Sequence, residues 1–543
     1  MKLDKNTLKQ YSIWKEANIE IPLYDIEEMV LKTRENPTWI HFGAGNILKS
    51  FIAPLQNTLL NLKKVETGII AVETYDMEII EKIYTPYDNL SLLTLMKPDG
   101  SLINSVVGSI AESLAGDTAY PRDWERLKFI FEKPSLQIVS LTITEKGYAL
   151  TDAAGNFLTD VKEDLIHGPA LPKHIISKIA SLAYCRYRKG ELPIAFVSMD
   201  NCSKNGEVLR ASVETVVKKW IESGFVEDKF LDYLNNPQKV SFPWTMIDKI
   251  TPRPSEKIQA KLNQSGFEST EIMCTEKKTF IAPFVNAEIP QYLVIEDHFP
   301  NGRMSLEAAG VLFTDRQTVE RVEKMKVGAC LNPLHTALAV FGCILSYQSI
   351  ADEMKDPCLR GLIEKTGYDE GLPVVVHPGI LDPKAFIKEV IDVRFPNPFI
   401  PDTPQRIATD TSQKIPVRFG ETIKTYCRDP QLDVDGLQYI PLIIAGWCRY
   451  LLEINDDGEN MELSPDPMLS ELKSHMAGIT FGDESSIENR LVPILSNEKI
   501  FGINLYTTTL GKKVEGYFKE MIQGKNAVKN VLKKYVMHHT NSF

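Results

Sequence analysis

Hydrophobic and polar positions follow two different patterns along the chain. Up to about residue 315, short apolar runs bounded by glycine, proline or charged residues predict buried strands, as in a parallel sheet covered on both faces. Beyond residue 316 the apolar positions are mostly at helical spacing, and residues 373–378 are the chief remaining strand signal. Weak helical periodicity predicts a leading helical arm over residues 1–36, and residues 512–543 are typical of an amphipathic helix with a tail. The predicted strands are 38–42, 67–73, 137–148 (running into a turn), 193–201 and 291–298.

A glycine turn directly follows the first predicted strand. Residues 43–46 are Gly-Ala-Gly-Asn, and helical apolar spacing continues from there to about residue 64. Strand, turn and helix form the opening of a dinucleotide-binding βαβ unit, in which Gly43 permits the tight turn and Gly45 lets backbone approach a pyrophosphate. The third glycine of the fingerprint is absent, because Leu48 stands there. The alternative is that the glycines form only a turn, without a ligand. The position of the motif between a strand and a helix favours a cofactor site.

An acidic residue closes the second predicted strand. In dinucleotide-binding units such an acid accepts hydrogen bonds from the adenosine ribose, and Glu73 occupies that place. Asp76 is a competing candidate, and either acid could instead cap the following helix. A carboxylate here repels a 2′-phosphate, so the sequence predicts NAD as the cofactor in preference to NADP.

Polar residues also follow the fourth predicted strand. Asp200, Asn201, Asn205 and Gly206 lie at its carboxyl end, where ligands collect in open α/β sheets, although the same residues could form only a β-turn. We therefore predict an α/β fold. It has a Rossmann-type cofactor-binding domain with its helical arm over residues 1–315 and a mainly α-helical domain over residues 316–543. Two domains are also the expectation from chain length.

Apolar residues at helical spacing dominate from residue 327 to residue 340, yet Lys326, Asn332 and His335 interrupt the run. Asn332 and His335 are spaced so that they share one helix face, and Lys326 precedes them. The plain alternative is a buried helix whose histidine binds a backbone carbonyl. Because each unpaired buried polar group costs a few kcal/mol, a cation, an amide and an imidazole together favour a catalytic helix.

Composition narrows the possible functions. The 543 residues include 61 Lys and Arg against 72 Asp and Glu, a net charge of −11, without a sustained basic run, which argues against nucleic-acid or anionic-membrane partners. The 8 cysteines form no C-x-x-C pair and no Cys/His cluster at zinc spacing, so no metal site is predicted. No signal-peptide core or membrane-length apolar stretch is evident, which predicts a cytoplasmic protein. We expect a monomer or small homo-oligomer.

Several motifs in a fixed order carry a family resemblance. They are Gly-x-Gly-Asn (43–46), Ser-Leu-Thr-Ile-Thr-Glu-Lys-Gly-Tyr (140–148), Asp-Asn-Cys-x-x-Asn-Gly (200–206), Phe-Pro-x-x-Met-Ile-Asp-Lys-Ile-Thr-Pro (242–252) and Asn-x-x-His-Thr-Ala (332–337). The series resembles the polyol-specific long-chain dehydrogenases from about residue 38 to beyond residue 420. The resemblance implies a Rossmann-type domain followed by a largely helical one. It also implies metal-independent hydride transfer between NAD(P)H and a ketose or keto-uronate.

The resemblance implies roles for individual residues. Lys326 corresponds to a catalytic lysine that is general base in oxidation and general acid in reduction, while Asn201 and Asn332 correspond to amides that polarise the reacting carbonyl. His335 corresponds to a histidine that orients substrate hydroxyls. An alcohol has no acidity near neutral pH, so its oxidation needs such a base and such donors. The substrate-binding candidates are Asp248 and Arg394, and the cofactor-binding candidates are Gly43, Gly45, Asn46, Lys49, Glu73, Asp76 and Thr142.

The expected substrate is a sugar acid. The resemblance favours interconversion of fructuronate and mannonate, with tagaturonate and altronate next and a neutral polyol such as mannitol third. Cations at Arg394, Lys414 and Arg418 favour a carboxylate substrate. The alternative from another class is a non-catalytic dinucleotide-binding protein.

The register of Lys326 departs from the family pattern. This lysine stands one residue further from Asn332 than the family's lysine usually does, and on an ideal helix of 3.6 residues per turn it would point away from the pocket. We predict that a π-type widening between Val327 and Leu331 absorbs the extra residue. The alternatives are a helix that begins after Lys326, or a replacement of Lys326 by Lys324.

Overall fold

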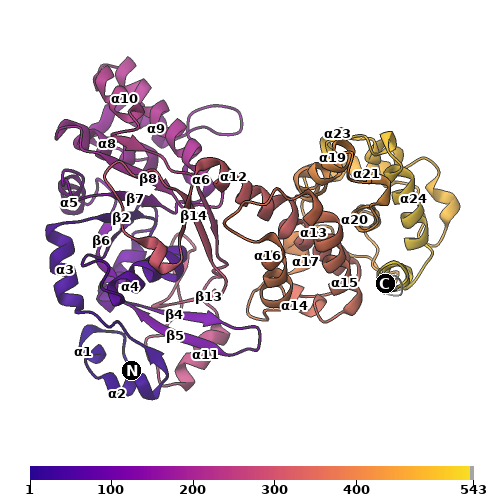
Figure 1. Ribbon diagram of the computed structural model, residues 1–543, viewed down its shortest axis with the longest axis horizontal. Coiled ribbons are helices and arrows are strands. Elements are labelled where there is room, and N and C mark those ends of the chain that lie inside the picture. Colours follow the sequence, from indigo (N-terminus) through magenta and orange to yellow (C-terminus); the bar gives the residue numbers. More distant parts are fainter. Residues whose placement is uncertain (538–543) are drawn as a thin grey trace. The chain divides into compact units, whose positions relative to one another are not determined.

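The computed structural model describes residues 1–537 and divides into two compact units (Figure 1). Unit 1 comprises Met1–Lys97 and Ser101–Glu320, and unit 2 comprises Pro98–Gly100 and Arg321–Phe543. The helix α12 (Arg316–Met325) runs across the boundary between them in the chain.

A six-stranded parallel sheet forms the centre of unit 1. Its order is β6-β3-β2-β7-β8-β9, which is the order of a doubly wound dinucleotide-binding fold. The predicted Rossmann-type α/β fold is therefore confirmed. The strands are β2 (Trp39–Phe42), β3 (Ile69–Glu73), β6 (Ile110–Ala115), β7 (Ile138–Leu141), β8 (Ile194–Ser198) and β9 (Val240–Ser241).

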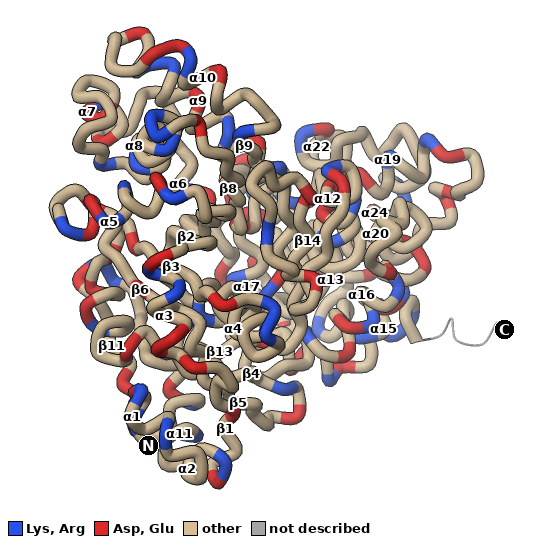
Figure 2. Tube along the Cα trace, turned by 60° about the vertical axis from the view of Figure 1, so that its left-hand side comes forward, with Lys and Arg blue, Asp and Glu red and all other residues tan. Residues whose placement is uncertain are grey.

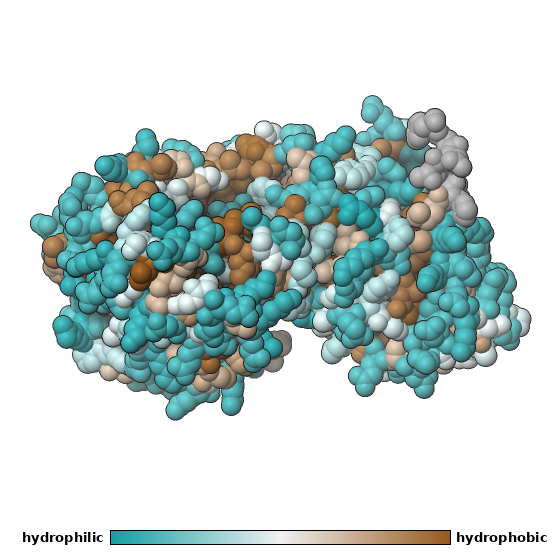
Figure 3. Space-filling view, turned by 90° about the horizontal axis from the view of Figure 1, so that it is seen from below, coloured by the Kyte–Doolittle hydropathy of each residue, from teal (hydrophilic) through white to brown (hydrophobic). Residues whose placement is uncertain are grey.

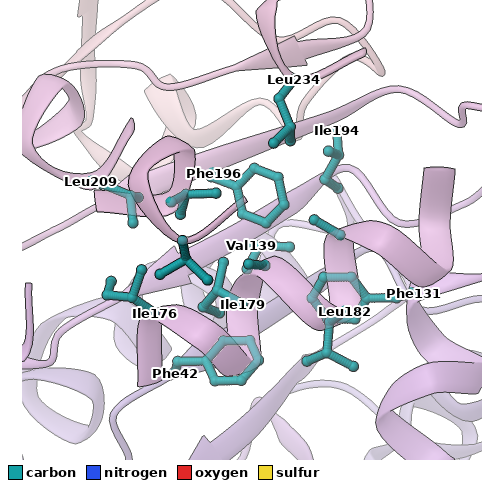
Figure 4. Close-up of a cluster of buried hydrophobic side chains, with 14 of the residues drawn as sticks. Phe42, Phe131, Val139, Ile176, Ile179, Leu182, Ile194, Phe196, Leu209 and Leu234 are labelled. Carbon is teal, nitrogen blue, oxygen red and sulfur yellow. The ribbon is translucent and has the colours of Figure 1, made fainter. Parts of the chain in front are cut away.

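The central strands divide their side chains between two hydrophobic cores, because successive residues of a strand point to opposite faces. In β2, Trp39 enters one core, while Ile40 and Phe42 enter the other. The Phe42 core is closed by α5 (Pro121–Phe131), α8 (Ile175–Arg188) and α9 (Asn205–Glu222), and Figure 4 shows side chains from these helices around the strands. The Trp39 core is closed by the helical run after the glycine turn, which contains η1 (Leu48–Ile52) and α4 (Ala53–Asn61).

Smaller sheets extend unit 1. The sequence predicted β14 but not the hairpin of β4 and β5, whose strands carry serine, threonine and asparagine among their apolar residues. The predicted N-terminal arm is mostly helical, with α1 (Lys5–Leu8), α2 (Tyr11–Glu16) and α3 (Ile26–Glu35), but it also contains the short strand β1. The strands are β1 (Ile19–Glu20), β5 (Leu102–Val107), β4 (Ser91–Met96) and β13 (Phe284–Glu288) in one sheet, β10 (Thr245–Asp248), β14 (Tyr292–Glu296) and β15 (Leu312–Thr314) in a second, and the pair β11 (Met273–Cys274) and β12 (Phe280–Ile281).

Unit 2 is mainly helical, as predicted, and is organised around α13 (Asn332–Ile344). This helix is apolar on nearly all sides and packs against α17 (Pro404–Ile407) and α20 (Tyr439–Tyr450). By length and composition the run Arg316–Ile344 could cross a membrane, but 78% of its apolar window is buried inside the protein, as in a core helix. Further helices are α14 (Ile350–Glu353), α15 (Pro357–Lys365), α16 (Pro383–Glu389), α18 (Thr411–Ile415), α19 (Glu421–Arg428), α21 (Leu469–Met476), α22 (Val492–Leu495), α23 (Glu498–Phe501), α24 (Leu510–Met521) and α25 (Ala527–Leu532).

The prediction of a strand at residues 373–378 is wrong. The segment begins in a 3-10 turn, η8 (Leu372–Val374), and continues without regular structure. Pro373 and Pro378 have no N–H to donate to a sheet, and Val376 is 67% exposed, so the valine run finds no partner strand. The predicted C-terminal helix appears as α24, α25 and η14 (Lys533–Met537), and residues 538–543 of that prediction lie outside the described residues.

Basic and acidic residues are interspersed along the chain (Figure 2). The face of the molecule in Figure 3 is largely hydrophilic, with hydrophobic side chains in limited patches.

One carboxyl group is buried against α13. Glu353, the last residue of α14, is 0% exposed, and its two carboxyl oxygens have no hydrogen-bond partner within residues 1–537. A Cβ added to Gly342 would lie 2.2 Å from Glu353 Oε1, so the glycine makes room for this side chain. Burial, assisted by the charge of Asp356, raises the pKa of Glu353 to about 10. The group is therefore neutral in the folded protein at neutral pH.

We expect Glu353→Gln to stabilise the protein increasingly as pH rises. Below its ordinary pKa of 4.5 the acid is protonated in both folded and unfolded chains, whereas between pH 4.5 and about 10 only the folded state keeps the proton. Folding is then penalised by roughly 3 kcal/mol at pH 7, at about 1.4 kcal/mol per pH unit. The thermal midpoints of both proteins at pH 5 and pH 8 give the measurement. Glu471→Gln, at an exposed acid, is the control, and equal gains at both pH values would contradict the expectation.

Candidate active site

The glycine turn after β2 has the geometry of a dinucleotide loop. Gly43 has φ +105°, and a Cβ there would lie 2.1 Å from the carbonyl oxygen of Thr142, so only glycine fits. An added Cβ at Gly45 has nothing within 4 Å, which leaves its backbone open to a ligand. The helix begins at Asn46, and a helix N-terminus favours an anionic phosphate. The residues present therefore fit the dinucleotide that the sequence predicted.

A chain of buried hydrogen bonds fixes this turn to β7. The Trp39 indole donates to Ser140 Oγ at 2.7 Å, Ser140 Oγ lies 2.6 Å from His41 Nδ1, and His41 Nε2 lies 2.8 Å from Thr142 Oγ1. Thr142 Oγ1 in turn donates to the Gly43 carbonyl at 3.3 Å. Because indole only donates and a carbonyl only accepts, the direction of the chain is set, and His41 carries its proton on Nε2. Burial lowers the pKa of His41 to about 3, so the ring stays neutral.

Glu73 also holds the turn. Its Oε2 accepts the N–H of Ala44 at 3.0 Å, and its Oε1 accepts the N–H groups of Thr74, Tyr75 and Asp76 at 2.9, 2.8 and 3.2 Å. Burial raises the pKa of this carboxyl, and the four N–H groups oppose that effect. The predicted ribose contact stays a prediction, and Oε2 is the oxygen with the larger remaining capacity for it.

Two other cofactor candidates have partners within unit 1. Asp76 is 2% exposed, and its Oδ2 accepts the hydroxyl of Thr275 at 2.6 Å. Lys49 is also 2% exposed and donates to the carbonyl of Ala282 at 3.0 Å, while burial lowers its pKa to about 8. A contact between Lys49 and the cofactor phosphates would require the amine to leave this bond.

Asp200 ties the two motifs at the carboxyl ends of β7 and β8 together. Its carboxylate accepts the N–H groups of Ile143 and Thr144 at 2.9 and 3.0 Å and the hydroxyl of Tyr148 at 2.6 Å. Thr144 has φ +62°, which is unusual for a β-branched residue and is held by these bonds. Sequence reasoning had considered Asp200 only as a ligand or turn residue, and the partner that it finds in Tyr148 lies in another motif.

The remaining unit 1 candidates differ in exposure. Asn205 is 1% exposed, and its side chain bonds the backbone of Thr245, which makes it a structural residue. Asn201, next to Asp200 at the end of β8, is exposed. Asp248 is the last residue of β10 and is 7% exposed.

The predicted widening beside Lys326 is confirmed. Residues Lys326–Cys330 form the π-helical turn η6, in which the N–H of Leu331 bonds the carbonyl of Lys326 at 3.1 Å. Leu331 leaves helical geometry with φ −132°, and α13 begins at Asn332. Pro333 in the first turn has no N–H, which favours a helix start at this point. Lys326 is 4% exposed, whereas Lys324 is exposed.

His335 follows on the first turn of α13 and has an acidic neighbour. Its Nε2 lies 3.3 Å from Asp402 Oδ2, without hydrogen-bond geometry, and its ring centroid lies 5.1 Å from that of Phe395. Burial lowers the pKa of His335 and outweighs Asp402, so the imidazole is neutral at neutral pH. Burial alone would raise the pKa of Asp402, but His335 and Arg406 bring it below its usual value. Sequence reasoning did not assign Asp402 a role.

Arg394 ends the π-turn η9 (Val390–Arg394) and is 3% exposed. It directly precedes Phe395, so the chain brings it next to a residue that contacts His335. Unit 2 thus brings Lys326, Asn332 and His335 together on one turn-and-helix segment. Asn201 and Asp248 belong to unit 1.

Comparison with known proteins gives matches over both units. The model of the Mannitol dehydrogenase Rossmann domain matches residues 37–308, and that of the Mannitol dehydrogenase C-terminal domain matches residues 318–522. A D-mannonate oxidoreductase of Thermotoga maritima is 53% identical over 538 residues, which is 99% of each chain. A D-mannonate oxidoreductase of Escherichia coli is 28% identical over 449 residues, which is 80% of this chain and 84% of that one. The ternary complex of Pseudomonas fluorescens mannitol 2-dehydrogenase with NAD and D-mannitol is similar with a TM-score of 0.68 and 26% identity, covering 98% of this chain and 99% of that one.

We expect Glu73→Gln to weaken both the fold and NADH binding. The Glu73 carboxylate accepts hydrogen bonds from backbone N–H groups, whereas a glutamine would turn its own N–H₂ group toward some of them. The turn then loses charge-assisted hydrogen bonds worth about 2 kcal/mol or more. We expect NADH to bind about 10-fold more weakly. Fluorescence titration with NADH and the thermal midpoint give the measurements, and Glu66→Gln, at an exposed acid before β3, is the control. Unchanged binding would show that Glu73 does not position the turn.

Proposed function

The chain belongs to the mannitol dehydrogenase family, and we propose that it is an NAD-dependent oxidoreductase that interconverts a keto-uronate and an aldonate, with fructuronate and mannonate as the preferred pair. The observation that carries the substrate class is the 53% identity, over 99% of both chains, to a D-mannonate oxidoreductase. We place the protein in the cytoplasm, as the sequence predicted.

Bound NAD(H) supplies or accepts the hydride. Lys326 handles the proton at the reacting oxygen: its ammonium gives a proton to the ketone oxygen in reduction, and its amine takes one from the hydroxyl in oxidation. Asn332 donates a hydrogen bond to the same oxygen, where negative charge develops. Asn201, in unit 1, is a further candidate for a polarising amide. The neutral imidazole of His335 orients a substrate hydroxyl. Because these groups stabilise the oxyanion themselves, we propose a metal-independent reaction.

A substrate panel tests this proposal. We expect NADH-dependent reduction of fructuronate to have the highest kcat/KM, followed by tagaturonate, and then by the uncharged ketose fructose. NADPH should serve less well, and a chelator should leave the rate unchanged. Tight NADH binding without reduction of any keto-uronate would contradict an enzymatic role and favour a non-catalytic dinucleotide-binding protein. A faster reaction with fructose would move the assignment to a polyol dehydrogenase.

The lysine register gives a sharper test. Lys326→Ala should lower kcat by about 1,000-fold, the order expected for loss of a general acid–base group, while NADH binding stays normal. Lys324→Ala is the matched control, since Lys324 is exposed on the same helix two residues earlier, and we expect little change. Single-turnover rates and NADH titration distinguish chemistry from binding. If Lys324→Ala were the inactive variant, the assigned base would be wrong.

A further inference from the structure

Arg418 lies against the first turn of α13 and has no acidic partner within residues 1–537. It belongs to η10 (Pro416–Gly420), and its Nη1 donates to the Thr336 hydroxyl at 2.5 Å and to the Asn332 carbonyl at 3.5 Å. Burial lowers the pKa of Arg418 to about 10, and no carboxylate within residues 1–537 offsets that effect. Asp402, the acid beside His335, is already paired with Arg406.

Two of the three guanidinium nitrogens of Arg418 have no hydrogen-bond partner within residues 1–537. Within residues 1–537, Nε and Nη2 donate to no protein group, although the side chain is largely withdrawn from water. These two nitrogens form an edge of the guanidinium that binds a carboxylate through parallel hydrogen bonds. Arg418 is partly exposed, so its side chain is not sealed from solvent.

Two arginines that are fully buried, Arg186 and Arg449, lack this feature. Arg186 uses Nε, Nη1 and Nη2 on backbone carbonyls, and so does Arg449. Both are 0% exposed. Every nitrogen of both guanidinium groups therefore donates to a backbone carbonyl, as expected for a structural arginine. Arg418 is left with an unused edge and an uncompensated charge, which the fold itself does not satisfy.

The unused edge lies beside the proposed catalytic face. Asn332, His335 and Thr336 are at positions i, i+3 and i+4 of α13 and share one side of the helix, and Arg418 contacts two of these three residues. Lys414, four residues before Arg418, is a second basic residue near it. Burial lowers the pKa of Lys414, and the charge of Arg418 lowers it further, which shows that the two groups are close. A carboxylate bound here would sit on the same side of α13 as the groups assigned to the reacting ketone.

We propose that the Nε–Nη2 edge of Arg418 binds the carboxylate of the sugar acid and thereby selects a keto-uronate over an uncharged ketose. The assignment rests on the proposed function and names the group that determines its substrate class. A neutral polyol or ketose gains nothing from this cation and leaves its charge without a counter-ion.

Arg418→Gln tests the assignment because it removes the charge and the fork. We expect kcat/KM for fructuronate to fall about 100-fold, mainly through KM, since losing one partner of a desolvated charge pair weakens binding by this order. The rate with fructose and the affinity for NADH should change less than about 3-fold. D-mannonate should raise the thermal midpoint of the wild type but not of the variant. Arg418→Lys keeps the charge without the fork and should lose about 10-fold.

Matched controls separate recognition from structure. Arg428→Gln, at an exposed arginine of unit 2, should leave all these values unchanged, whereas Arg186→Gln should lower the thermal midpoint. Equal losses with fructuronate and fructose, together with a lower midpoint, would show that Arg418 only supports α13 and would overturn the assignment, as would full retention of fructuronate activity in both Arg418 variants. A wild-type protein that reduces no keto-uronate would instead contradict the proposed function.

Discussion

The hydrogen bond from the Leu331 N–H to the Lys326 carbonyl is the constraint on which the proposed chemistry depends. It spans five residues where an α-helix spans four, and it ends one helical segment so that the next can begin at Asn332. Without it, a lysine at this spacing would point away from the face of His335. The widened turn is held by its surroundings, because η6 packs against η7 (Thr366–Gly371) and η10, and by Pro333, which has no N–H to continue the preceding helix.

In unit 1, hydrogen bonds likewise hold the glycine turn after β2 in place. The third glycine of the dinucleotide fingerprint is missing, and Leu48 in its place is fully buried in the core. The turn is held instead by side chains: Glu73 from β3 accepts the Ala44 N–H, and Thr142 from β7 donates to the Gly43 carbonyl. Neighbouring strands therefore fix the loop from both sides. This leaves Gly45 with open space, which is the part of the turn where a ligand can approach.

Buried ionisable groups in unit 2 show two different solutions to desolvation. The Glu353 carboxyl, without hydrogen-bond partners in the described chain, takes up a proton and becomes neutral. His335 stays neutral by losing one, even with Asp402 beside it. The guanidinium of Arg418 cannot become neutral near neutral pH, because its pKa remains far above that range even after burial. An arginine that the fold leaves without an anion therefore points to an anion from outside.

The sequence by itself determined the fold class of unit 1, the helical character of unit 2, the glycine turn and the widened turn at Lys326. These depend on local patterns: apolar runs in β2, β3, β7 and β8, the need for glycine at position 43, and the helical pitch that relates Lys326 to His335. Only the tertiary structure decided what those side chains contact. The bond of Glu73 to Ala44, the bond of Lys49 to Ala282 and the contact of Asp402 with His335 join segments that are distant in the sequence. The valines at 373–378 do not form a strand because no strand of the described residues pairs with them. The unused edge of Arg418 could not be predicted from the sequence, because it depends on which carbonyls surround the guanidinium. Pattern fixes which element a segment forms, whereas burial, charge and hydrogen bonding are properties of pairs of residues that come together only when the chain has folded.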